Sequence, residues 1–156
     1  MEIELHERTE NHVRIYFERA QDVEVKKYLS QTVASVKQAL ENFAGTQKTD
    51  ATSYGRTIYV DGVYIGDIWC YAMNLNDTPQ AMVSYCIFDK SHWGKGVMSG
   101  ALALFLSEIS NRYGIISVGA FSFSENTASV RVLEKNGFRV LETFSEDGMD
   151  SVYLQK

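Results

Sequence analysis

Hydrophobic and polar positions along the chain follow two periods, one typical of helices and the other of strands. A short first strand is expected over Ile3–Leu5, followed by a helix from about Glu10 to Leu29. A second helix, which Ser30 or Thr32 would cap, has an apolar face. This face consists of Val33, Val36, Ala39, Leu40 and Phe43.

The middle of the chain has the alternation of strands. Asp61-Gly62 is its strongest turn signal, because a tight hairpin needs positive φ angles. The expected strands are Thr57–Val60, Val63–Ile65 with its continuation Gly66–Met73, and, after a turn at Asn74–Pro79, Ala81–Phe88.

The carboxy-terminal part returns to alternating helices and strands. A long apolar run after Gly96 predicts a buried helix that ends near Gly114. The elements expected after it are a strand over Ile115–Phe121, a helix over Asn126–Lys135, and a hairpin of Phe138–Phe144 with Met149–Leu154 around the turn Glu146-Asp147-Gly148. The pattern predicts an α/β sandwich with a mixed sheet, and one domain over residues 1–156.

Composition narrows the function classes. The chain has 156 residues, 45% of them hydrophobic, and a formal net charge of −5. A chain of this length builds a core without metal or disulfide bonds. The acidity argues against a nucleic-acid partner, because nucleic-acid backbones need clustered Lys and Arg. Yet the segment Asp89–Arg139 carries four acids and six bases, +2, which leaves −7 for the remainder. This segment is where an anion is expected.

Location and redox chemistry follow from what the sequence lacks. The amino terminus does not have the basic and apolar regions of a signal peptide, and no apolar run approaches the ~20 residues of a membrane span. We therefore expect a cytoplasmic protein without a membrane partner. Cys70 and Cys86 have no metal-ligand spacing, so they are expected to be buried small hydrophobes, and no metal site is predicted.

The segment Tyr85–Ser99 is the most informative, because it places a glycine loop between a strand and a helix. The first N–H groups of a helix have no intrahelical partner and attract a phosphate. Lys95, between Gly94 and Gly96, either adds a cation or is simply solvated. The spacing matches neither a Walker A loop nor the G-x-G-x-x-G fingerprint, which would need a glycine at Ser99.

This loop resembles the acetyl-CoA loop of the GNAT family of N-acetyltransferases, whose pattern ends in Gly-x-Gly. Ser91 stands where the family most often has Arg or Gln, but the ribosomal-protein N-terminal acetyltransferases RimJ and RimL tolerate this and commonly have Trp-Gly-Lys-Gly. The stretch Ser124–Phe138 is similar to the N-x-x-S-x-x-x-x-x-K-x-G-F pattern of the same subgroup. The resemblance implies a mostly antiparallel sheet flanked by helices, with two strands splayed at the cofactor site.

The resemblance also implies a cofactor site. Acetyl-CoA would lie between the splayed strands, with its pyrophosphate on the loop and a backbone N–H near Ile87 polarising the thioester. The implied cofactor-binding residues are Ile87, Phe88, Trp93, Gly94, Lys95, Gly96, Val97, Met98, Asn126 and Ser129.

Catalytic groups are harder to assign. The tyrosine that many members use as the acid is Leu133 here, and the frequent strand carboxylate is Met82. Ser129 matches the acid proposed for the RimL-like subgroup, or it caps a helix or positions the ligand. Glu146 matches a Glu of that subgroup, or it is a solvated turn residue. A water chain that ends at Asp67, His92 or Glu125 is the other route for the proton.

The function expected is acetyl transfer from acetyl-CoA to a primary amine, either a protein N-terminus or a small molecule. An α-amine is favoured, because a neutral lysine side chain costs ~3.5 kcal/mol more at fixed pH. The −7 remainder suggests a cationic acceptor, and the resemblance adds a homodimer as a partner. The alternatives are a non-catalytic acyl-CoA-binding module and, with less support, a nucleotide-phosphate binder.

Overall fold

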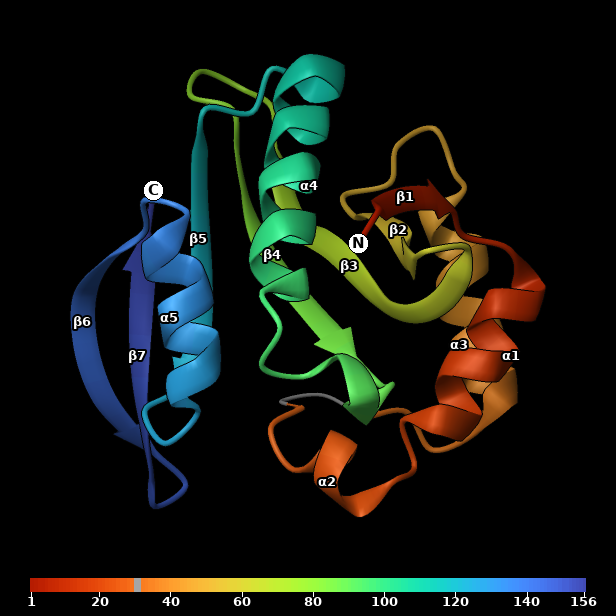
Figure 1. The fold of residues 1–156 in the computed structure, drawn as a ribbon. Coiled ribbons are helices and arrows are strands. Elements are labelled where there is room, and N and C mark those ends of the chain that lie inside the picture. The colour runs from red at the N-terminus through yellow and green to blue at the C-terminus, as the bar shows by residue number, and fades with distance from the viewer. Residues whose placement is uncertain (30–31) are drawn as a thin grey trace.

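The structure, a computed structural model, describes residues 1–29 and 32–156. Its strands form one seven-stranded sheet in the order β1-β2-β3-β4-β5-β7-β6 (Figure 1). The strands are β1 Ile3–Glu7, β2 Tyr54–Val60, β3 Val63–Asn74, β4 Gln80–Ile87, β5 Ser117–Phe123, β6 Arg139–Glu146 and β7 Met149–Gln155. Every neighbouring pair is antiparallel except β4 and β5. The predicted mixed, mostly antiparallel sheet is confirmed.

Helices pack on both faces of this sheet. They are α1 Glu10–Arg19, α2 Val23–Lys26, α3 Val36–Thr46, α4 Val97–Tyr113 and α5 Thr127–Lys135, with a short 3-10 turn η1 over Lys90–His92. The main core lies under α4, and its buried cluster includes Val83 of β4 and Phe105 of α4. A second cluster on the other face joins Val25 of α2 to Cys86 of β4. Successive strand residues point to opposite faces, so the two layers share β4.

The first predicted helix is wrong in its extent. The residues from Glu10 to Leu29 form α1 and the short α2 instead of one helix. The break has a local cause, because the Asp22 side chain accepts hydrogen bonds from the N–H groups of Glu24 (2.9 Å) and Val25 (3.3 Å) and thereby starts a new helix.

The second predicted helix starts later than expected. Ser35 is the N-cap of α3 and accepts from the N–H of Gln38 at 3.1 Å. Thr32 and Val33 precede the helix, and Ser30 lies outside the described residues. The face that includes Ala39 and Phe43 is half-buried, as the spacing predicts.

The hairpins and α4 agree with the sequence, with small shifts. The turn at Asp61-Gly62 has positive φ at both residues, and β5 starts two residues later than predicted. Glu146 was expected in the last turn, but it is the final residue of β6, and the turn itself is Asp147-Gly148. None of the helices in the described ranges is long and apolar enough to cross a membrane.

Candidate active site

The parallel strands β4 and β5 separate soon after they meet. They pair only from Gln80 to Met82, opposite Ser117 to Gly119. Beyond Met82, the two strands diverge toward the lower side of Figure 1. The predicted splay is confirmed, and it leaves one edge of β4 without a strand partner among the described residues.

The backbone of Ile87 faces this gap. The N–H of Phe88 donates to the carbonyl of Ile65 in β3, at 3.0 Å, so the N–H of the preceding residue points the opposite way, toward β5. The Trp93 indole N–H donates to the Ile87 carbonyl at 2.9 Å, which fixes the loop against the strand end. Phe88 itself is only 2% exposed and its N–H is bonded, so that N–H is not free for a cofactor.

The glycine loop has the conformation that a phosphate site requires. Gly94 and Gly96 have φ angles of 71° and 77°, a region that disfavours any side chain. The first backbone bond of α4 runs from the Gly100 N–H to the Gly96 carbonyl, at 3.2 Å. The N–H groups of Val97 and Met98 have no acceptor in the described part of the chain. They point out of the helix start, where an anion fits.

A salt bridge anchors the loop to α2. The Lys90 ammonium lies 3.0 Å from an Asp22 carboxylate oxygen and 3.3 Å from one of Glu24. Lys95 is exposed and forms no salt bridge with the residues that the structure describes, so it is the lysine of the loop that is available to an anion.

Asn126 and Ser129 begin α5 on the other side of the gap. Asn126 is the N-cap, and its side-chain oxygen accepts from the Ser129 N–H at 3.3 Å. Asn126 therefore caps the helix that follows it. The Ser129 hydroxyl is left for another contact.

Tyr85 makes that contact from β4. Its hydroxyl lies 2.9 Å from Ser129 Oγ and 3.2 Å from the Ser129 carbonyl oxygen, across the mouth of the gap. Burial raises the pKa of Tyr85 to about 12, so its hydroxyl keeps its proton near neutral pH. Either hydroxyl can donate in the 2.9 Å contact, and in the arrangement where the phenol donates, the serine proton points elsewhere. Sequence reasoning missed this residue.

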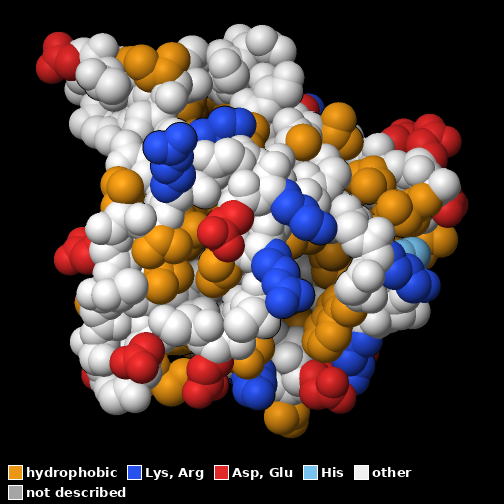
Figure 2. All heavy atoms as spheres, turned by 60° about the vertical axis from the view of Figure 1, so that its left-hand side comes forward, with side chains coloured by type: hydrophobic (Ala, Val, Ile, Leu, Met, Phe, Trp, Pro, Cys, Tyr) orange, Lys and Arg blue, Asp and Glu red, His pale blue; other side chains and the backbone are white. Residues whose placement is uncertain are grey.

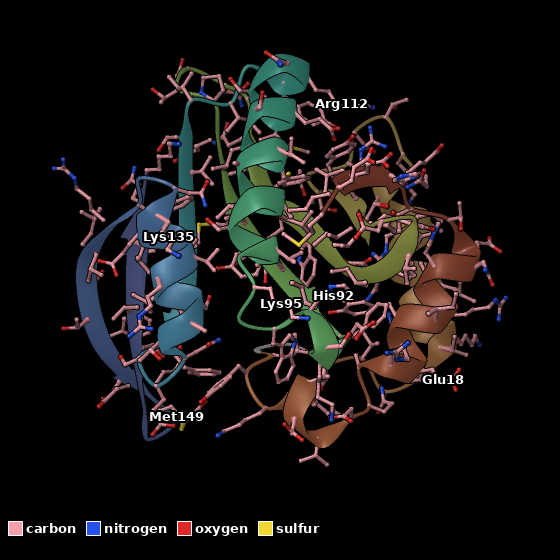
Figure 3. All side chains as sticks on the ribbon, in the orientation of Figure 1. Glu18, His92, Lys95, Arg112, Lys135 and Met149 are labelled. Carbon is pink, nitrogen blue, oxygen red and sulfur yellow. The ribbon has the colours of Figure 1, made fainter. Side chains whose placement is uncertain are left out.

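The remaining predicted positions do not join this pair. Leu133 is 1% exposed and packs in the core, so it offers no acid. Glu146 is exposed and pairs with Met149, which Figure 3 shows at the lower end of the β6–β7 hairpin. No recorded hydrogen bond joins Glu146 to Ser129 or Tyr85 within the described residues.

The cysteines are poor nucleophiles. Burial raises the pKa of Cys70 to about 12 and the pKa of Cys86 to about 11. Both side chains therefore remain neutral thiols, and only thiolates attack efficiently. This favours direct transfer over a covalent cysteine intermediate.

Asp67 is a buried carboxylate on the α1 side of β3. It is 1% exposed, accepts from the Tyr64 hydroxyl at 2.6 Å, and lies 3.0 Å from an Arg8 guanidinium nitrogen. Burial raises the pKa of Asp67 to about 6 against the pull of Arg8. A side chain enclosed in this way holds the segment after β1 against β3 rather than meeting a substrate.

The raised pKa of Asp67 makes a prediction about stability. Its unfolded pKa is 3.8, so the unfolded state ionises first as pH rises, and the folded state loses up to about 3 kcal/mol between pH 4 and 6. Asp67→Asn is expected to remove this part of the pH profile in urea unfolding from pH 4 to 7. The unpaired Arg8 costs stability equally at each pH, because arginine stays charged.

The control is Asp50→Asn, at an exposed position, which should keep the wild-type profile. If Asp67→Asn shows the wild-type slope between pH 4 and 6, the carboxylate does not titrate in this window.

Comparison with known proteins now assigns the family. The model of the acetyltransferase (GNAT) domain matches residues 2–139. The chain belongs to the GNAT acetyltransferase family. The comparison with curated protein sequences gave no match for this chain.

Several solved structures share its fold at low sequence identity. Spermidine N-acetyltransferase from Vibrio cholerae, solved with CoA and spermine, has a TM-score of 0.85 and 15% identity, over 99% of this chain and 94% of that one. RimL, a ribosomal L7/L12 α-N-protein acetyltransferase solved with CoA, has a TM-score of 0.82 and 19% identity, over 99% and 93%. Aminoglycoside acetyltransferase AAC(6')-Ib, solved with CoA, has a TM-score of 0.82 and 15% identity, over 99% and 94%.

The surface charge of this GNAT domain agrees with the charge count. Figure 2 turns the α5 side of Figure 1 forward, and lysine and arginine side chains gather over the middle of this face. Most of the acidic side chains in that view stand toward its edges. A positive centre suits the phosphates of a nucleotide cofactor.

Proposed function

We propose that this GNAT domain transfers the acetyl group of acetyl-CoA directly to a primary amine, either a protein N-terminal α-amine or a small-molecule amine. The observation that carries the proposal is the β4–β5 gap, which has the glycine loop at its mouth, the Ile87 backbone on one side and Ser129 on the other. CoA-bound relatives with this fold acetylate amines of these kinds by name. Acetyl-CoA is the cosubstrate that fits.

In the proposed complex, the pyrophosphate accepts hydrogen bonds from the N–H groups between Trp93 and Met98, and Lys95 adds a positive charge. The pantetheine arm follows the free edge of β4. The thioester carbonyl accepts from the Ile87 N–H, which stabilises the negative charge that develops on that oxygen.

The chemical step then needs two proton transfers. The neutral amine attacks the thioester carbon, a C–N bond forms, and the C–S bond breaks. The nitrogen gives up one proton to a base, the departing sulfur takes one from the Ser129 hydroxyl, and the serine oxygen regains a proton from solvent. The Tyr85 hydroxyl lies 2.9 Å from Ser129 Oγ, where it can donate to the serine oxygen as the serine proton moves to sulfur. Ser129 is therefore the proposed acid and Tyr85 its positioning residue.

The proton from nitrogen needs a base. Glu146 is the proposed one, because it is an exposed carboxylate at the turn end of the β6–β7 hairpin, which lies beyond the carboxyl end of β5. A water chain to His92 or Glu125 is the alternative. Asp67 is less suited, because both its oxygens face Arg8 and Tyr64 in the interior.

The test is a thiol-release assay with acetyl-CoA and a panel of amines: short peptides, spermidine, kanamycin and free amino acids. Amine-dependent release, with the acetylated amine identified by mass, is the expected result. Tight CoA binding without turnover on any amine would favour the non-catalytic acyl-CoA-binding module.

Tyr85→Phe removes only the hydroxyl that contacts Ser129. We expect kcat to fall about 10-fold while KM for acetyl-CoA changes little, because one hydrogen bond to the acid is lost in the transition state. The acidic limb of the pH–rate profile should stay in place, since Tyr85 does not titrate near neutral pH. Tyr71→Phe, on the neighbouring strand β3, is the matched control, and equal losses in both variants would contradict the positioning role.

A further inference from the structure

A large cavity of the described structure lies on the α1 side of the sheet. It measures about 820 Å³ and lies between α1, α3 and the strands β2 and β3, with Trp69 in its wall. The helix α3 has no fully buried side chain and packs mainly on α1, which leaves this space open. None of the described residues that line the cavity belongs to β4, β5, α5 or the glycine loop.

The charge of the cavity wall is opposite to that of the chain. Five bases line it, with one acid, Glu7, although the chain has 20 acidic and 15 basic side chains. The bases are Arg8, Lys26, Lys48, Arg56 and Arg112. Arg8 and Arg56 have carboxylate partners, Asp67 at 3.0 Å and Glu108 at 2.7 Å.

Lys48 and Arg112 have no such partner. Within the described ranges, no carboxylate forms a salt bridge with either side chain. The Arg112 guanidinium stacks 4.7 Å from the ring centroid of Tyr54, and its Nε–H donates to the Tyr113 hydroxyl at 3.2 Å. Its terminal nitrogens have no acceptor among the described residues and are available at the cavity. Figure 3 shows Arg112 at one end of α4 and Lys95 near the other, so these cations are separate from the proposed phosphate site.

The inner wall of the cavity approaches the reacting position. The ring of Tyr16 lies 6.3 Å from Trp69 and 6.1 Å from Phe88, centroid to centroid. Phe88 directly follows Ile87, whose N–H is the proposed thioester donor. The aromatic side chains at this end of the cavity therefore lead to the residue next to the proposed thioester donor.

Strand register gives the length of that occupant. Ile87 lies opposite Gly66, and Tyr54 lies opposite Cys70. Four residues along β3 span about 13 Å, and two strand spacings add about 10 Å sideways, so the diagonal is about 16 Å. An extended peptide covers this distance in about five residues.

We propose that the acceptor is the N-terminus of an extended peptide with acidic side chains about five residues from its α-amine. This rests on the proposed function and names the substrate class. The α-amine lies at Ile87, the chain follows the aromatic wall, and the acidic side chains meet Lys48 and Arg112. The neighbours' polycationic substrates, spermidine and aminoglycosides, fit a wall of this charge poorly.

The test uses three C-terminally amidated hexapeptides that begin Ser-Ala-Ala-Ala and end in Glu-Glu, Gln-Gln or Lys-Lys. The expected kcat/KM is at least about 10-fold higher for the acidic peptide than for the neutral one, and lowest for the basic one. Equal values for the three peptides, or a free amino acid used as well as the acidic peptide, would overturn the proposal.

Charge-reversal variants locate the effect. In Lys48→Glu and Arg112→Glu, the preference for the acidic peptide should fall to about 2-fold or reverse. The matched control is Lys37→Glu, an exposed lysine of α3 outside the cavity wall, which should keep the wild-type preference. A preference that survives in both cavity variants, or that disappears in the control, contradicts the assigned position.

A binding measurement separates this inference from the proposed function. Labelled versions of the three peptides are titrated into the CoA-bound protein and followed by fluorescence anisotropy. If no amine is acetylated, the proposed function fails, but tighter binding of the acidic peptide, lost in Lys48→Glu, still supports the peptide site. Equal binding of the three peptides overturns it whatever the turnover.

Discussion

Ser129→Ala is expected to lower kcat about 100-fold and to leave KM for acetyl-CoA within about 3-fold of wild type. The departing thiolate would then have to take its proton from water instead of from a hydroxyl held in place. Alanine favours helix, and Asn126 still caps the same backbone N–H, so α5 should fold normally. Steady-state thiol release with the best amine of the panel measures both constants.

Two further variants show whether the hydroxyl is responsible. Ser129→Thr keeps a hydroxyl and should recover part of the rate. Thr127→Ala removes an exposed hydroxyl from the same helix and should match wild type. If Ser129→Ala retains full kcat, Ser129 is only a helix residue, and the proton comes from elsewhere.

Gly96→Ala is the second substitution with a large expected effect, because it should weaken acetyl-CoA binding at least about 30-fold. Gly96 is the N-cap of α4 at a φ of 77°, and the loop around it must let phosphate oxygens reach backbone N–H groups. An alanine Cβ would either shift this backbone or occupy the space of the phosphate.

Gly114→Ala is its matched control. Gly114 ends the same helix at a φ of 69°, and neither glycine has a heavy atom within 4 Å of the position of an added Cβ. Both variants should lose about 1–2 kcal/mol of unfolding free energy, since both force alanine into the left-handed region. Isothermal titration with acetyl-CoA distinguishes them, and equal affinities in the two variants would contradict the phosphate site at Gly96.

Much of the architecture was predictable because local signals determine it. The positive φ at Asp61-Gly62, and the glycines at both ends of α4, follow directly from the residue types. The break after Arg19 was missed because helical spacing continues across it. Asp22 caps a new helix at this point. In the sequence, however, Asp22 stands inside a run of helical apolar spacing, and that spacing predicts one continuous helix.

The candidate site was predictable only for the parts that a single continuous segment of the chain forms. The glycine loop is local, and its conformation agrees with the expectation. Tyr85 was placed in the correct strand, but its contact with Ser129 joins residues 44 positions apart. The alternation of strand residues shows which face of the sheet a side chain lies on, but not which helix covers that face. The roles of Ser129 and Glu146 remain predictions.

The charge count was also limited by the lack of three-dimensional information. When the net charge is divided by sequence segment, the −7 outside Asp89–Arg139 predicts an acidic surface that faces a cationic acceptor. In the structure, five bases from five different parts of the chain line one cavity, because the segments before α1 and after α3 meet α2, β2 and α4 there. Charge summed over sequence segments does not describe a surface built from distant residues.

The most direct measurement of the central claim follows the acetyl carbonyl itself. Acetyl-CoA labelled at the carbonyl carbon is mixed with the protein and the best amine, and the labelled carbon is observed by NMR. We predict that its thioester signal converts directly to an amide signal on the amine, at a rate that Ser129→Ala lowers about 100-fold. A thioester signal that persists with every amine while the cofactor is bound, or that converts only to free acetate, would contradict the account.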